Sequence, residues 1–254
     1  MRYGRGAESI LARIVLLLLL FAAVPASGLT LEEINALQSE VRDRPLGERI
    51  ALFAEKFVGT PYDPDPRGAY VTGETIVADG EVDCMYLVFR AVELALSSTP
   101  EEAVRAALDK RFVTAGVLVE GRVSNYEDRF AYGEDMIKSG KWGRDITAEI
   151  GKTVRVRKVR DGDYADILPP RELLGGMEKL RSGDIIFFTK TPGKEVAGEL
   201  VGHLGIVITE KLPHPGIYVI HASGKKGKGG AVKKVSLKEY LKKMPFAGAK
   251  ITRF

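Results

Sequence analysis

The sequence predicts an α+β fold, with helices in the first half of the chain and an antiparallel sheet in the second. Two observations favour this class. Helical spacing of apolar residues dominates the early segments, at 31–41, 46–57, 83–96 and 99–110. Short apolar segments divided by turn residues dominate after Gly183, at 184–189, 203–209, 216–221 and 231–235. Because the two kinds of segment do not alternate, neighbouring strands are expected to be antiparallel.

Local signals mark where the helices begin. Thr30 with Glu33 is a capping-box pattern, and Thr99 precedes a proline at the first helical position. Asp83 is a natural cap for the helix that follows it, and Ser236 for a short helix ending near residue 243. We expect a strand-like piece at 71–77, a loop-rich insert at about 111–149 and a last strand at 250–252.

The first residues have the pattern of a secretory signal peptide. Three arginines precede an unbroken apolar run at 14–24, and small residues follow it. This run is shorter than the roughly 20 residues that span a bilayer. We therefore predict a leader at 1–28, a single domain at 29–254, and an exported protein that is periplasmic or extracellular and leaves the membrane once the leader is removed.

Net charge and metal-ligand patterns argue against two classes of function, nucleic-acid binding and metal binding. The leader carries three Arg and one Glu, so the formal net charge of +4 falls to +2 for the mature chain, which gives no reason to expect a nucleic-acid partner. The acidic segment 161–166 lacks the spacing of a calcium loop, and no His/Cys cluster suggests zinc. We expect neither metal nor cofactor. The oligomeric state stays open.

Cys84 is the one cysteine in the chain. It lies in the first turn of the predicted helix at 83–96, where unpaired backbone N–H groups and the helix dipole stabilise a thiolate. The alternative is an inert buried cysteine. A nucleophilic cysteine also needs a base to receive its proton.

Two of the three histidines can supply that base. His203 and His221 flank an apparent hairpin whose midpoint falls at Leu212, which predicts that they pair directly across it. One imidazole could then face the thiolate while the other fixes its tautomer. His214, between two prolines at the turn, is expected to be a solvated loop residue. For either histidine considered alone, the simpler interpretation is a hydrogen-bonded polar residue in or near the core.

The order of these motifs resembles the NlpC/P60 superfamily of cell-wall hydrolases, and is most similar to its N-acetylmuramoyl-L-alanine amidase-like branch. The motifs are Gly59-Thr60-Pro61-Tyr62, Val82-Asp83-Cys84, Gly183-Asp184-Ile185-Ile186, Gly202-His203-Leu204-Gly205-Ile206-Val207 and Ile220-His221-Ala222-Ser223. Together they extend over roughly residues 46–243.

The resemblance implies a papain-like fold in which a cysteine at a helix N-terminus packs on an antiparallel sheet. Cys84 would attack a carbonyl, His203 would act as general base and then acid, and His221 would orient it. Tyr62 and Asp83 would help bind the substrate. Met85 departs from the pattern, because this superfamily usually carries Ser or Thr beside the cysteine.

The implied substrate is peptidoglycan, as fragments or as the intact sacculus. Two bonds fit, the amide between muramic acid and L-alanine and the γ-D-glutamyl bond to the diamino acid of the stem peptide. Two other functions stay open, a peptidoglycan-binding module without catalysis and an acyltransferase of the same fold.

Overall fold

The computed structural model describes residues 28–158, 160, 162–191, 194, 198–211, 215–225 and 228–254. The predicted leader, apart from Gly28, and His214 lie outside these residues. Within them, no helix is both long and apolar enough to cross a membrane.

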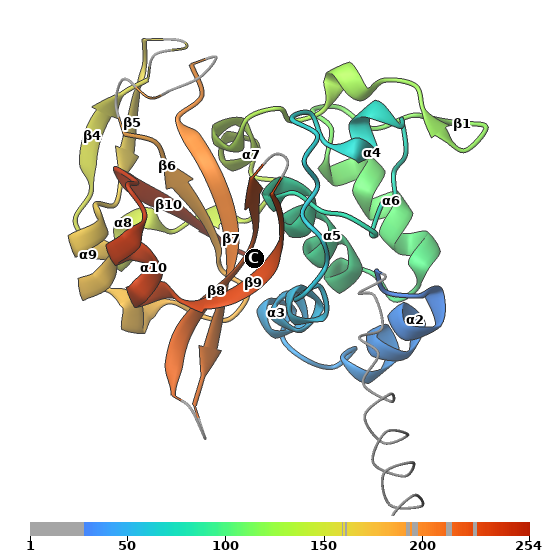
Figure 1. The fold of residues 1–254 in the computed structure, drawn as a ribbon, viewed down its shortest axis with the longest axis horizontal. Helices are drawn as coiled ribbons and strands as arrows, with labels where there is room; N and C mark the ends of the chain where they lie inside the picture. The colour runs from blue at the N-terminus through green and yellow to red at the C-terminus, as the bar shows by residue number, and fades with distance from the viewer. Residues whose placement is uncertain are drawn as a thin grey trace, which may run out of the picture.

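Four helices form a layer on one side of the sheet (Figure 1). They are α2 (Leu31–Glu40), α3 (Leu46–Lys56), α5 (Cys84–Leu96) and α6 (Pro100–Lys110), close to the predicted ranges. The caps form as expected, since Thr30, Asp83 and Thr99 each accept a backbone N–H from the first turn. Helix α5 is central, and every residue from Tyr86 to Ala95 is buried.

The main sheet has six antiparallel strands in the order β3-β10-β6-β7-β8-β9. The strands are β3 (Arg144–Asp145), β6 (Ile185–Thr189), β7 (Val201–Glu210), β8 (Gly216–Lys225), β9 (Gly229–Ser236) and β10 (Gly248–Arg253). The α+β class and the antiparallel sheet are therefore confirmed.

The two faces of the sheet bury separate apolar clusters. Leu204, Ile206 and Ile220 pack with the helices that include α3 and α5. Val207 and Val219, from the alternate positions, pack against α9 (Pro170–Gly175) and α10 (Leu237–Lys243) on the other face. The sheet is thus covered by helices on both sides (Figure 1), and residues of one strand reach different layers according to their parity.

The remaining elements are short. They are α4 (Ala69–Thr72), β1 (Leu118–Val119), β2 (Arg122–Val123), η1 (Tyr126–Asp128), α7 (Gly133–Ser139), α8 (Thr147–Ile150), β4 (Val154–Arg157), β5 (Tyr164–Ile167) and η2 (Met177–Lys179). Several of them occupy the segment 111–149, joined by loops.

The strand-like piece predicted at 71–77 is wrong. Residues Ala69–Thr72 instead form the short helix α4. The buried carboxylate of Asp63 accepts the backbone N–H of Ala69 at 2.6 Å and that of Asp65 at 2.9 Å, which fixes the preceding loop. This contact spans six residues and no local pattern predicts it.

Candidate functional site

Cys84 is the first residue of α5, at the end of the helix that meets the sheet. Asp83 caps the helix in extended conformation, and its Oδ1 accepts the N–H of Tyr86 at 2.6 Å. The loop before it is held by a parallel bridge between Tyr62 and Val82. Cys84 is a free, half-buried cysteine that packs against the helical core cluster. The sequence therefore placed it correctly at a helix N-terminus.

Burial decides the state of the thiol. It raises the pKa of Cys84 to about 12, and the Asp83 carboxylate adds to the shift. The backbone N–H groups of Leu204, Cys84 and Met85 favour the thiolate and offset only part of this. The expected stabilisation by the helix terminus is thus present but outweighed. Leu204 directly follows His203, so the sulfur lies next to that part of β7.

The two imidazoles contact each other. His203 Nε2 and His221 Nδ1 are 3.0 Å apart, and the ring planes are nearly perpendicular at 85°. One nitrogen donates and the other accepts, according to the tautomer. If His203 carries its proton on Nε2, its Nδ1 is left unprotonated and can accept a proton.

The predicted register of the histidine hairpin is wrong. Strands β7 and β8 pair Ile206 with Ile220 and Val207 with Val219, which is a shift of two residues from the predicted pairing. The ladder covers only Ile206 to Glu210 on β7, so His203 lies beyond it. The histidines share a face and meet along a diagonal. This works because an imidazole is long enough to reach a diagonal neighbour.

An aromatic cluster encloses the histidine pair. Phe188 pairs with His203 across β6 and β7, Phe246 lies parallel to the His203 ring at 5°, and Tyr240 of α10 lies 4.7 Å from His221 between ring centroids. Burial lowers the pKa of His203 to about 3, with a further contribution from His221. Burial also lowers the pKa of His221 to about 4, followed by the charge of Lys233. Both imidazoles are therefore neutral at neutral pH.

Tyr240 was missed by the sequence reasoning. Burial raises its pKa, and the charge of a Cys84 thiolate would raise it further, which places its hydroxyl within electrostatic reach of the sulfur. Helical spacing from Leu237 and Leu241 indicated that Tyr240 faces the sheet. Nothing local indicated that it would meet His221.

Tyr62 and Asp83 also lie beside the thiol. Burial raises the pKa of Tyr62, and the charges of Cys84 and Asp83 add to it. Burial likewise raises the pKa of Asp83 to about 6. The Tyr62 ring rests against Gly224, where a Cβ would lie 2.4 Å from Tyr62 Cδ1. Tyr62, Asp83 and Cys84 thus lie together at the start of α5, and His203 and His221 form a second, contacting pair. The two groups are linked through Leu204, whose N–H favours the thiolate, and through Tyr240, which lies beside His221 and within electrostatic reach of the sulfur.

Met85, the residue that departs from the expected pattern, is partly buried and packs against the helical core cluster. A cavity of about 660 Å³ lies elsewhere, beside Gly47, Ser182 and Thr209, and none of the five residues lines it. Among the described residues, no group of three or more His, Cys, Asp or Glu is arranged to hold a metal ion.

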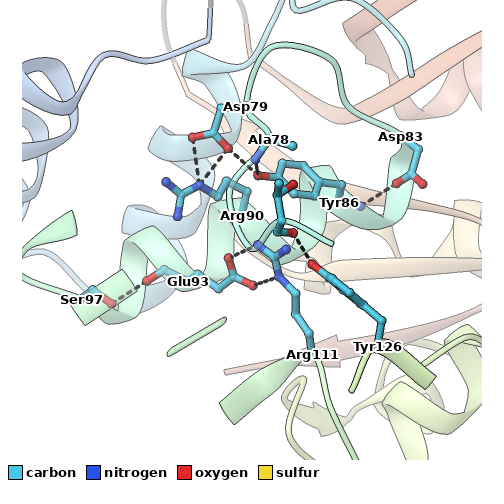
Figure 2. Close-up of polar contacts among 10 residues, drawn as sticks. Ala78, Asp79, Asp83, Tyr86, Arg90, Glu93, Ser97, Arg111 and Tyr126 are labelled. Carbon is cyan, nitrogen blue, oxygen red and sulfur yellow. Dashed lines mark hydrogen bonds and ion pairs between the residues drawn. The ribbon is translucent and has the colours of Figure 1, made fainter. Parts of the chain in front are cut away.

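A buried polar network holds the loop that precedes the thiol (Figure 2). The Tyr86 hydroxyl donates to Asp79 at 2.7 Å and accepts the N–H of Ala78 at 2.6 Å. Arg90 Nε bonds both Asp79 oxygens, at 2.9 and 3.0 Å. Since Tyr86 and Arg90 belong to α5, this network ties residues 78–79 to the helix that carries Cys84.

The described pKa shifts predict how the free thiol reacts. Because burial raises the pKa of Cys84 to about 12 and lowers that of His203 to about 3, the resting pair is neutral. Alkylation by iodoacetamide is expected to accelerate about tenfold per pH unit from pH 6 to 10, since only the thiolate reacts. Glutathione, measured in parallel, should level off above about pH 9. A plateau for Cys84 at neutral or acidic pH would instead reveal a preformed thiolate–imidazolium pair.

Comparison with known proteins shows a shared fold. No family model matches the chain, and no curated protein matches it. Among solved structures, an N-acetylmuramoyl-L-alanine amidase from Bacteroides uniformis ATCC 8492 is similar at a TM-score of 0.63 and 22% identity, over 82% of this chain and 98% of that one. A Bacteroides fragilis protein named only provisionally, as a xylanase, has a TM-score of 0.62 and 23% identity over 80% of this chain and 100% of that one.

A third similar structure is a Legionella pneumophila str. Philadelphia 1 protein of the DUF1460 family. Its TM-score is 0.65 at 17% identity, over 87% of this chain and 93% of that one. The three neighbours carry different names, so what they share with this chain is the α+β fold over most of its length.

Proposed function

We propose that this protein is a cysteine hydrolase that cleaves an amide bond in peptidoglycan, with a papain-like fold of the NlpC/P60 type. The observation that carries the proposal is a thiol at a helix start beside the N–H of Leu204, the residue that follows one member of a hydrogen-bonded histidine pair. A nucleophile, a base and a group that orients the base are the three parts of such a mechanism. The similar B. uniformis structure, named an N-acetylmuramoyl-L-alanine amidase, supports the choice of substrate.

Each residue has a defined role in this reaction. His203 donates Nε2–H to His221 Nδ1, so its Nδ1 takes the proton of Cys84 as the sulfur attacks the carbonyl. The resulting imidazolium gives that proton to the departing amine, leaving a thioester. Water, deprotonated by His203, then attacks the thioester and releases the acid, and His203 returns the proton to the Cys84 sulfur. Backbone N–H groups at the start of α5 stabilise the oxyanion.

Proton transfer accompanies attack in this scheme, because the resting thiol and imidazole are both neutral. Tyr62 and Asp83, beside the thiol, bind the part of the substrate next to the bond that is cut. The predicted leader at 1–28 would deliver the enzyme to the compartment that holds its substrate.

The test is mass spectrometry of purified peptidoglycan fragments after incubation with residues 29–254, beside the Cys84→Ala variant. We expect new fragments only with the wild-type chain, and their masses identify which of the two amide bonds is cut. Cleavage by Cys84→Ala would refute the cysteine mechanism. Sacculus binding without cleavage by either protein would favour a binding module, and transfer to an added amine would favour an acyltransferase.

A further inference from the structure

Lys233 stands directly across from His221. Strands β8 and β9 pair His221 with Lys233, and opposed residues of antiparallel strands project from the same face with Cβ atoms about 5 Å apart. His221 is buried, with 4% of its surface exposed, whereas Lys233 is exposed. The ammonium group therefore lies at the solvent edge of the histidine pair.

Lys233 has no acidic partner among the described residues. The next residue along the strand, by contrast, has two. Lys234, on the opposite face of β9, forms ion pairs with Glu55 and Glu210. No ion pair or hydrogen bond joins the Lys233 side chain to any other residue that the structure describes. Within the described part of the chain, nothing neutralises its charge.

This unpaired charge affects the neighbouring imidazoles. Lys233 lowers the pKa of His221, which in turn contributes to the lowered pKa of His203. A nearby cation disfavours the imidazolium that the proposed reaction requires. An anion bound to Lys233 would cancel that effect at the moment when the substrate is in place.

The rest of the site directs an anion to this position. Two carboxylates, Asp63 and Asp83, lie on the α5 side of the thiol. They are close together, because the charge of Asp63 adds to the raised pKa of Asp83. These carboxylates repel an anionic group, whereas Lys233 attracts one. The site is thus polarised, acidic beside α5 and basic beside β9.

We propose that Lys233 determines specificity by binding a carboxylate of the substrate close to the amide bond that is cut. This inference rests on the proposed function and adds a substrate class to it, an amide whose neighbouring group carries a free carboxylate. The same amide with that carboxylate converted to a carboxamide is predicted to be a poor substrate.

Two peptidoglycan fragments that differ only in this group, carboxylate or carboxamide, provide the test. We expect wild-type kcat/KM to be at least about tenfold higher for the carboxylate fragment than for the carboxamide fragment. The carboxamide cannot make the charged hydrogen bond with Lys233. Lys233→Met should remove this preference, mainly through KM, and Lys233→Arg should keep it. Lys238→Met, an exposed lysine of α10, is the matched control and should behave as wild type. Equal rates on both fragments, or a preference that survives Lys233→Met, would overturn the proposal.

Binding measurements separate this inference from the proposed function. Calorimetric titration of Cys84→Ala with both fragments should show the same preference of about tenfold, and Cys84→Ala/Lys233→Met should lack it. If the wild type cuts neither fragment and Cys84→Ala still prefers the carboxylate, hydrolysis is refuted while the role of Lys233 stands. If Cys84→Ala binds both fragments equally or binds neither, the role of Lys233 is refuted whatever the cleavage result.

Discussion

Replacing His203 with alanine is expected to lower kcat/KM on peptidoglycan fragments by about 10²- to 10⁴-fold, the usual contribution of a general base. The reason is specific to this site. With a thiol pKa raised to about 12, almost no thiolate exists at neutral pH without a base to receive its proton. Steady-state kinetics with a fragment identified as a substrate measures the effect.

His221 is the control for this prediction. In the proposed mechanism its Nδ1 accepts a hydrogen bond from His203 and does not exchange a proton with the substrate. His221→Ala should therefore lower kcat/KM by less than His203→Ala does. His221→Gln, whose side-chain oxygen can accept the same hydrogen bond, should recover part of the loss. A His203→Ala variant as active as wild type would contradict the assignment, provided that its unfolding curve matches that of the parent.

Breaking the Glu93–Arg111 pair is expected to destabilise the protein by about 3–5 kcal/mol, because one partner leaves the other as an uncompensated buried charge. Both side chains are buried, with exposures of 0% and 1%, and two hydrogen bonds of 2.6 Å join them. The Arg111 guanidinium also lies over the rings of Tyr86 and Phe89, at 4.9 and 5.5 Å from their centroids. Figure 2 shows the pair beside the network that holds residues 78–79.

Urea unfolding of Glu93→Gln and Arg111→Met measures this effect. The double variant Glu93→Met/Arg111→Met should be more stable than Arg111→Met alone, since it leaves no unpaired charge. Arg105→Met, which removes an exposed ion pair with Glu102, should change the free energy of unfolding by less than about 1 kcal/mol. A loss below about 1 kcal/mol for both buried single variants would show that the pair is not needed for stability.

The arrangement explains why the thiol can lie in a buried site and still be a plausible nucleophile. Burial alone would make Cys84 inert, which was the alternative to catalysis. In the proposed mechanism, the histidine pair beside Leu204 receives its proton. If Lys233 binds a substrate carboxylate as proposed, it also determines which substrates favour that proton transfer.

The sequence by itself determined the four long helices before residue 111, the strands after Gly183 and the position of Cys84 at a helix start. It did not predict the short helices and strands between residues 111 and 180. The predicted elements depend on signals a few residues apart, such as the Thr30–Glu33 capping box and the Asp83 cap, and on apolar periodicity within one element. The same local signals failed at α4, where a carboxylate six residues away decides the conformation.

Only the tertiary structure decided how the site is assembled and what state its groups are in. The diagonal contact of His203 with His221 depends on a register two residues from the symmetric one, and a hairpin midpoint alone does not fix that register. Tyr240 of α10 and Phe246 of the following loop reach the histidines by packing on the sheet, and Lys233 lies opposite His221 because β9 pairs with β8. The pKa values of Cys84 and His203 follow from burial, which is a property of many distant segments packed together and is not encoded by any one of them.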